Sequence, residues 1–227
     1  MQVLAVNLCN PGPNPRAGIV TSGIDKRPVA GPVAVTSPAT AGVGAVGLAG
    51  DRVDDVRHHG GPDRAVYAYA REDLDYWERE LGRALTPGTF GENLTTSGLD
   101  ISAALIGERW RIGQDVVLEV STPRIPCRTF QRWLESTGWV KRFTSAARPG
   151  TYLRVLEPGE IRPGDRVEVG YRPDHDVTVA LTFRALTREP ALLPRLLVAA
   201  SLPEDVESLV RRRTGHRPPG THLPAGS

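Results

Sequence analysis

The stretch Ser121–Leu134, STPRIPCRTFQRWL, is where the pattern of the chain changes from strand to helix. Pro123 and Pro126 fix their own φ and push the residues before them out of the helical region, so the chain reaches Cys127 extended and stiff. Beyond Cys127 the apolar residues recur at helical spacing. We therefore expect a helix to begin here, with Pro126 in its first turn and Cys127 one position further in.

The thiol of Cys127 lies in a setting that favours its reactive form. Arg124 and Arg128 flank it with permanent positive charges, and the start of a helix adds the positive end of the helix dipole. Each influence favours the thiolate, which is the form that acts as a nucleophile or a metal ligand. The alternative is a small cysteine buried in the core. The two prolines, two arginines and helix start favour a functional site at Cys127.

Composition limits the class of protein. The chain has 227 residues with 40% hydrophobic and 24% charged residues, which is ordinary for one large globular domain or one domain with a small appendage. The net charge of +2 argues against a general nucleic-acid binder. Cys9 and Cys127 make neither a metal-spacing pair nor a disulfide framework. With no leader-like start and no long apolar run, we expect a cytoplasmic protein that has no contact with a membrane.

The order of patterns predicts a mainly β protein with a helical end. Short β-branched and glycine-bearing runs, typical of strands bent at barrel corners, continue to about residue 170, interrupted by a clear helix over 71–81. We expect a many-stranded β domain over 1–172 that carries a few helices. Proline-separated helical patterns predict a small helical appendage over 173–214, and the residues 215–227 read as a flexible tail.

The usual catalytic motifs leave several alternatives open. The chain has no nucleotide-binding fingerprint and no serine nucleophile elbow. His58 and His59 are adjacent, so on a strand they point to opposite faces and at most one serves a given site. Zinc would need more ligands than the remaining cysteines and histidines readily supply. Cys127 with His59 would make a nucleophilic pair. Glu92 is either a general acid or base, or a carboxylate that only shapes its turn.

Several motifs together are more specific than any one of them. HHGGPDRAVYAYARE, PGTFGENLTTSGLD, IGERWRIG and EVSTPRIPCRTF occur in this order, with SGIDKRPVAGPVAV and GLAGDRVDD before them and TYLRVLEPGEIRPGDRVEV after them. In this combination the chain resembles the MOSC domain family, in particular its YiiM-like branch, over about residues 3–170. The helical segment that follows resembles the C-terminal extension of that branch.

The resemblance implies both a fold and a chemistry. MOSC domains are β-barrel-like, and their hallmark cysteine, matched here by Cys127 in PRIPC, binds the molybdenum cofactor or carries sulfur to it. YiiM-like proteins are associated with molybdenum-dependent reduction of N-hydroxylated compounds such as hydroxylaminopurines, a detoxification role. A soft thiolate suits such a metal centre, and arginines beside it suit the phosphate of a pterin.

Further site residues follow from the resemblance. Glu92 and His59 are the candidate proton donors. The candidate cofactor contacts are Arg124, Arg128, Lys26, Arg64, Gly60, Gly61, Asp63, Phe90, Gly91 and Asn93, with Cys127 as the metal ligand. We expect the HGGPD and FGEN loops to line the pocket and to present amide donors to an anion. The alternative is that both loops simply build turns of the barrel.

The resemblance also implies partners. Because the sequence shows no flavin, haem, iron–sulfur or nucleotide motif, electrons would come from a separate donor protein and the substrate would be a small N-hydroxylated molecule. A homodimer is left open. One alternative is a carrier of sulfur or cofactor that uses Cys127 without turnover, and another is a cofactor-free binding module.

Overall fold

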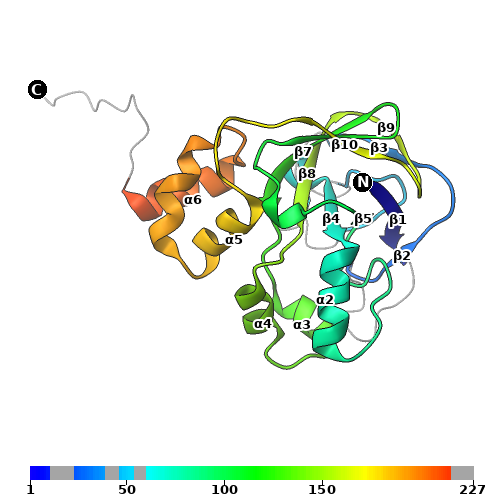
Figure 1. The fold of residues 1–227 in the computed structure, drawn as a ribbon, viewed down its shortest axis with the longest axis horizontal. Coiled ribbons are helices and arrows are strands. Elements are labelled where there is room, and N and C mark those ends of the chain that lie inside the picture. Colours follow the sequence, from blue (N-terminus) through cyan, green and yellow to red (C-terminus); the bar gives the residue numbers. More distant parts are fainter. Residues whose placement is uncertain (11–22, 39–45, 54–59, 216–227) are drawn as a thin grey trace, which may run out of the picture.

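The computed structural model describes residues 1–10, 23–38, 46–53 and 60–215. Eight strands form one sheet in the order β10-β6-β7-β8-β4-β5-β1-β2 (Figure 1). Its pairings are antiparallel except that of β4 with β5. The strands are β1 (Gln2–Cys9), β2 (Lys26–Pro28), β4 (Val66–Ala70), β5 (Leu94–Ser97), β6 (Arg109–Ile112), β7 (Val116–Pro123), β8 (Thr151–Glu157) and β10 (Val167–Tyr171), while β3 (Val33–Val35) and β9 (Gly159–Ile161) pair separately.

The sheet curls until the start of β1 meets the turn that leads into β10. The carbonyl of Met1 accepts a hydrogen bond from Val167 N at 3.0 Å, and Val3 exchanges two bonds of 2.8 Å with Gly164 and Asp165. These bonds join two parts of the strand order that lie far apart, while β10 and β2 remain its edges. The predicted mainly β, barrel-like domain is therefore confirmed, with a sheet that is curled rather than fully closed.

Strand β4 separates two hydrophobic cores. Because side chains alternate along a strand, Val66 and Ala68 enter the core inside the curled sheet, whereas Tyr67 and Tyr69 point to its other face. On that face they join a group that we call the aromatic cluster, which consists of Tyr67, Tyr69, Trp77, Phe90, Phe130, Trp139, Phe143, Tyr152 and Phe183.

Three helices cover the aromatic cluster. They are α2 (Arg71–Leu81), α3 (Arg128–Trp133) and α4 (Trp139–Ala146), and Figure 1 shows them together below the sheet. The predicted helix over 71–81 is confirmed, and it ends at Gly82, whose left-handed backbone lets its N–H bond to Glu78 O.

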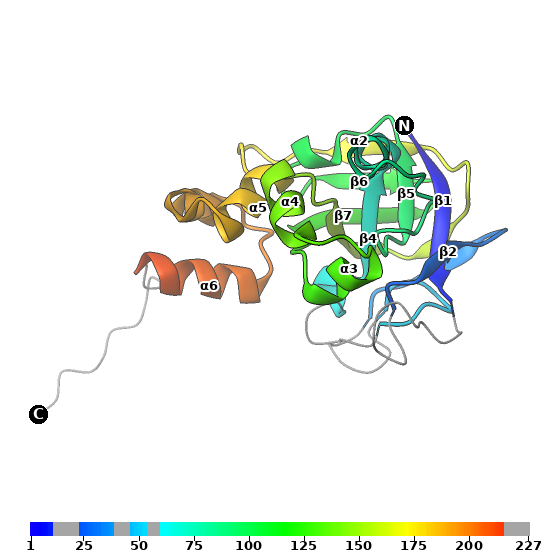
Figure 2. The same cartoon turned by 90° about the horizontal axis from the view of Figure 1, so that it is seen from below.

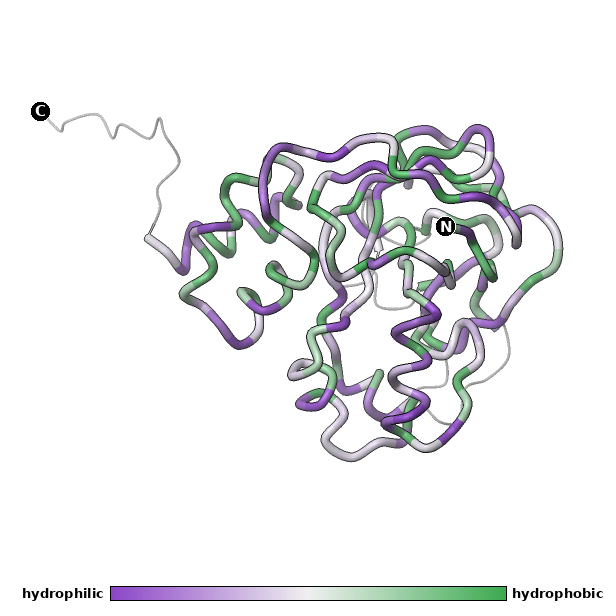
Figure 3. Tube along the Cα trace, in the orientation of Figure 1, coloured by the Kyte–Doolittle hydropathy of each residue, from purple (hydrophilic) through white to green (hydrophobic). Residues whose placement is uncertain are grey.

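The predicted helical segment follows β10. It consists of α5 (Val179–Thr187), the 3₁₀ helix η4 (Pro190–Val198) and α6 (Glu204–Thr214), and hydrophobic and hydrophilic positions are interspersed along it (Figure 3). The middle helix is 3₁₀ because Pro194 lies inside it and has no N–H for the backbone ladder. Two backbone bonds, Ile106 N to Val177 O and Val179 N to Ala104 O, tie this segment to the β domain.

Two short 3₁₀ helices complete the described fold, η2 (Pro62–Arg64) and η3 (Ile101–Ala103). Within the described ranges, no helix has both the length and the apolar character that a membrane span requires.

We predict that Gly150→Ala destabilises the fold much more than Gly82→Ala. Both glycines have a φ of +64°, so both variants carry the left-handed penalty of about 1–2 kcal/mol. At Gly82 the added Cβ meets open space, whereas at Gly150 it would lie 2.6 Å from both Ala68 O and the ring of Tyr69. Overpacking adds about 1–3 kcal/mol at Gly150. Urea unfolding of the two variants measures the difference in unfolding free energy. Equal losses of stability in the two variants would contradict the prediction, because they would show that β4 moves to accommodate the added Cβ at no cost.

Candidate functional site

Cys127 lies where β7 has ended and α3 is about to begin. Its backbone is extended, with φ −128° and ψ 173°, and it is the N-cap residue of α3. The predicted helix start is therefore wrong by two positions, because Pro126 precedes the helix instead of lying in its first turn. Since α3 has only 6 residues, the helix dipole is a weaker support for the thiolate than the sequence indicated. The thiol itself is half-buried and free.

Arg124 is the buried charge beside this thiol. Only 5% of the residue is exposed, and its guanidinium carbon lies 4.4 Å from the ring centroid of Phe130 and 5.1 Å from that of Tyr67. Its Nη1 donates a hydrogen bond to the carbonyl of Phe90. Its Nε is buried and has no hydrogen-bond partner among the residues that the structure describes. Arg124 thus joins the aromatic cluster to the FGEN loop and keeps one donor unused.

The electrostatics of Arg124 link it to Cys127. Burial alone would lower the pKa of the guanidinium, but Tyr152, Tyr67 and Cys127 outweigh that effect, so the pKa is raised above its ordinary value. Arg124 is therefore a permanent cation close to the thiol. Arg128 differs from it because its side chain is exposed and it makes no ion pair within the described part of the chain.

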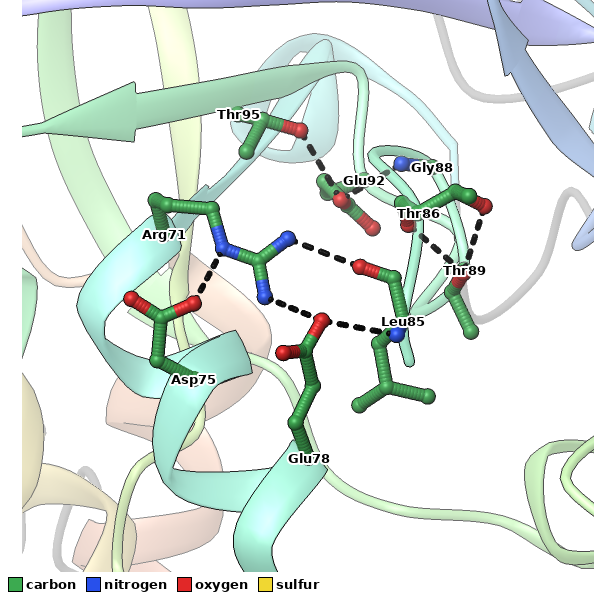
Figure 4. Close-up of polar contacts among 9 residues, drawn as sticks. All are labelled: Arg71, Asp75, Glu78, Leu85, Thr86, Gly88, Thr89, Glu92 and Thr95. Atoms are coloured by element: carbon green, nitrogen blue, oxygen red, sulfur yellow. Dashed lines mark hydrogen bonds and ion pairs between the residues drawn. The ribbon is translucent and has the colours of Figure 1, made fainter. Parts of the chain in front are cut away.

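Glu92 organises the FGEN loop from inside. The residue is fully buried, and its carboxylate accepts hydrogen bonds from Gly88 N at 2.6 Å, Phe90 N at 2.9 Å and the Thr95 hydroxyl at 2.9 Å. Figure 4 shows the carboxylate turned toward its own loop. This geometry supports the structural alternative for Glu92 and gives no support to a role as proton donor.

A second set of contacts fixes the chain just before this loop. The guanidinium of Arg71 donates hydrogen bonds to Asp75 at 2.7 Å, to Leu85 O at 2.7 Å and to Glu78 at 2.8 Å (Figure 4). Glu78 in turn accepts from Leu85 N at 2.8 Å. The loop after α2 is therefore held at both ends by charged side chains.

Gly91 brings the FGEN loop close to Arg124. A Cβ on Gly91, whose φ is +73°, would lie 3.1 Å from Ile24 Cγ1 and 3.2 Å from Arg124 Nη1. A Cβ on Gly88 would lie 2.3 Å from Lys26 O. The loop therefore packs by its backbone against residues 24–26 on one side and Arg124 on the other. The side chain of Phe90 is buried in the aromatic cluster, and its carbonyl accepts the bond from Arg124.

Lys26 is committed to a buried ion pair. Its ammonium lies 2.5 Å from Asp51 Oδ2, and the two side chains are only 5% and 3% exposed. Asp51 also accepts from Asn93 Nδ2 at 2.8 Å and from Cys9 N at 2.9 Å, and Asn93 Oδ1 accepts from Tyr67 N at 3.1 Å. Lys26 and Asn93 thus reach the site as parts of one network that supports the FGEN loop.

Asp51 and Tyr67 are site residues that the sequence analysis missed. Asp51 lies in GLAGDRVDD, a signal that contributed to the resemblance but carried no assigned role. Tyr67 lies in VYAYA of β4, within the motif HHGGPDRAVYAYARE, which did not reveal that its ring would face Arg124.

The HGGPD element makes its described contacts elsewhere. Gly60 and Gly61 are buried, and Asp63 forms an ion pair of 2.5 Å with Arg154. Arg64 pairs with Asp205 of α6 at 2.6 Å, so it faces the helical segment, and no contact joins it to Cys127 in the part of the chain that is described. His59 lies outside the described residues, and its role as a proton donor stays a prediction.

The described side chains that could bind a metal suit a metal ion that brings its own organic ligand. Among the described residues, no group of three or more His, Cys, Asp or Glu side chains could hold a metal ion. A metal that carries its own organic ligand needs only one ligand from the protein, and the Cys127 thiol can provide a soft one. The unused donor of Arg124 suits an anionic part of such a group.

The comparisons decide the family. The family model for the MOSC domain matches residues 55–168. This chain belongs to the MOSC family. Among its relatives, the uncharacterized protein YflK of Bacillus subtilis is 35% identical over 158 residues, which cover 68% of this chain and 71% of YflK. YiiM of Escherichia coli is 34% identical over 137 residues, which cover 59% of this chain and 60% of YiiM.

A third relative is much longer than this MOSC protein. A reductase of Gibberella moniliformis is 31% identical over 189 residues, which cover 82% of this chain but only 32% of the reductase. The MOSC chain thus spans about a third of that relative.

Solved structures agree with the family and extend beyond its core. The crystal structure of YiiM from Geobacillus stearothermophilus matches with a TM-score of 0.74 at 27% identity, covering 93% of this chain and 98% of YiiM. YiiM from Escherichia coli matches with a TM-score of 0.70 at 25% identity, covering 96% and 94%. The match therefore includes most of the helical segment, and the predicted resemblance to the YiiM-like branch is confirmed.

We predict that Glu92 makes stability depend on pH in a defined direction. Burial raises the pKa of the Glu92 carboxyl above its ordinary value of 4.5, although its hydrogen bonds oppose the shift. A raised pKa stabilises the fold below the unfolded value, and this contribution is lost as pH rises through the folded value. The unfolding free energy of the wild type relative to Glu92→Gln should therefore fall as the pH rises above the ordinary pKa of the carboxyl.

Urea unfolding at several pH values checks this, with Glu160→Gln as the control for loss of an exposed carboxyl. At neutral pH, Glu92→Gln should still cost about 1–3 kcal/mol because its amide cannot accept every bond that the carboxylate accepts. A relative stability that rises with pH would show that hydrogen bonding outweighs burial.

Proposed function

We propose that this MOSC protein binds a molybdenum cofactor through Cys127 and reduces small N-hydroxylated compounds, such as N-hydroxylated bases. The observation that carries the proposal is the half-buried Cys127 thiol close to the buried guanidinium of Arg124, whose Nε retains an unused donor. A soft ligand next to a permanent cation suits a metal centre that carries an anionic organic ligand.

The residues of the chain have separate tasks in this proposal. Cys127 holds the metal of the cofactor, and Arg124 presents a positive charge to the same group. When bound, the cofactor supplies two-electron, oxygen-accepting redox chemistry. Lys26, Asp51 and Asn93 hold the FGEN loop against Arg124 through buried bonds, so their role is to keep the site in shape.

The proposed reaction requires a source of electrons. Converting an N–OH group to N–H takes two electrons and two protons and releases one water molecule. The electrons come from a separate protein, since the sequence has no flavin, haem or iron–sulfur motif. The name of the Gibberella relative, a reductase, supports this class of reaction.

We predict that Cys127→Ala abolishes molybdenum binding while Cys9→Ala does not. Each variant removes one thiol, but Cys9 is buried in β1. Comparing the two variants therefore distinguishes the loss of a metal ligand from the loss of a core cysteine. After expression in a host that makes molybdenum cofactor, we expect about one molybdenum atom per chain in the wild type and in Cys9→Ala. We expect almost none in Cys127→Ala. Elemental analysis and pterin fluorescence measure the metal and the cofactor.

Activity separates the reductase from the carrier. With dithionite as the electron source, the loaded wild type should reduce an N-hydroxylated base, and Cys127→Ala should be slower by at least about a hundredfold. Molybdenum bound without turnover would favour the carrier of cofactor or sulfur. Equal molybdenum in Cys127→Ala and wild type, or none in either together with no pterin, would overturn the proposal.

A further inference from the structure

The segment that carries the thiol has an unusual charge. Residues 121–150 contain six lysines and arginines and one acidic residue, Glu135, so the segment carries +5, whereas the whole chain carries +2. The rest of the chain is therefore net negative, at −3. A single-sign cluster on a small part of a balanced protein creates a local field that attracts charged partners.

Three of these cations are free to act on a partner. Arg128 and Arg132 lie one turn apart on α3, so they share a face, and both are exposed, as is Lys141 on α4. None of the three has an ion-pair partner within the described ranges. By contrast Arg142 and Arg148 are paired with Glu80 and Asp73 of α2.

A fourth cation extends the face at the other end of α3. Arg83 is exposed, and its Nη2 donates a hydrogen bond of 2.5 Å to Leu134 O, the C-cap residue of α3. Cations therefore line α3 from its first residue, next to Cys127, to its last turn. Figure 2 shows α3 at the surface of the molecule, with α4 beside it.

Apolar side chains lie beside these charges. Ile125 is 43% exposed, which makes it one of few exposed large hydrophobic residues in the described part of the chain. In the extended segment before α3, the neighbours Arg124 and Pro126 are buried, and Ile125 turns to the open side. Cys127 is half-buried and packs against the edge of the aromatic cluster. Trp133 is partly exposed as well. Exposed apolar side chains next to polar ones are typical of protein interfaces.

We propose that this basic face, formed by Arg83, Arg128, Arg132 and Lys141 with the exposed Ile125 at the Cys127 end of α3, docks a small acidic electron-transfer protein. The inference rests on the proposed reductase function, which requires a protein that donates electrons. It specifies where on this chain that protein binds and that its binding surface is acidic. A flavin protein that delivers two electrons meets the balance of the reaction. Because the face begins at the residue after the thiol, a docked donor would lie close to the metal ligand.

The test is direct binding of a purified acidic flavodoxin to the full chain. We expect the double variant Arg132→Glu/Lys141→Glu to bind at least about tenfold more weakly than the wild type in isothermal titration at low salt. Rising salt should weaken the wild-type complex. Arg128 stays unchanged because it is a candidate cofactor contact.

The matched control is Arg212→Glu/Arg213→Glu on α6. These arginines are exposed and without an ion-pair partner in the described residues, and their reversal changes the net charge by the same amount. The control should bind flavodoxin within about twofold of the wild type. Thermal unfolding confirms that both double variants are folded.

The outcomes separate this inference from the proposed function. If flavodoxin binding is weakened equally in both double variants, or is weakened in neither of them, the basic face is not the docking surface. A single-stranded oligonucleotide that binds the same face more tightly than flavodoxin would also overturn it. With dithionite as the donor, Arg132→Glu/Lys141→Glu should retain the wild-type rate. A failure of turnover or molybdenum binding in the wild type would count against the reductase alone, since binding of flavodoxin is measured without turnover.

Discussion

The guanidinium of Arg124 lies between the rings of Tyr67 and Phe130 and donates to the carbonyl of Phe90. This one buried cation connects β4, α3 and the FGEN loop. A buried charge is costly unless several groups compensate it, and here two aromatic faces, a carbonyl and the nearby thiol do so together. The thiol therefore gains a permanent positive neighbour whose position is fixed by three separate parts of the chain.

The buried ion pair of Lys26 and Asp51 also supports the site. Removing Lys26 and Asp51 from water costs on the order of several kcal/mol per ion, which a good geometry and further hydrogen bonds must offset. Asp51 meets that condition because it also accepts from Asn93 and from Cys9 N. The FGEN loop is thus held by this network through Asn93 and by the hydrogen bonds of Glu92 within the loop. Its backbone can therefore pack closely against Arg124.

The helical segment after β10 contributes to the same core. Phe183 of α5 packs edge-on against Phe143 of α4, with ring centroids 6.1 Å apart, and Arg188 donates to Ser145 O at 3.2 Å. Asp205 of α6 pairs with Arg64 of the HGGPD element. The segment therefore supports both α4 and η2, and the agreement with complete YiiM structures shows that it is part of the fold of these relatives.

The sequence by itself determined the elements whose signals are local. Local patterns identified the helix α2, the mainly β character of the first part of the chain and the helical segment after it. The prolines around Cys127 placed the thiol at a strand-to-helix junction, with an error of two positions in the helix start. Such signals need only neighbouring residues, so they are readable from the chain alone.

Only the tertiary structure decided what each polar residue does. The family resemblance predicted Lys26 and Arg64 as cofactor contacts and Glu92 as a proton donor, and only the structure shows that these side chains contact Asp51, Asp205 and Gly88. Asp51 and Tyr67 gained a role in the site through contacts across the fold. The physical reason is that the state of a buried charge depends on groups brought to it from distant parts of the chain, which no local pattern records.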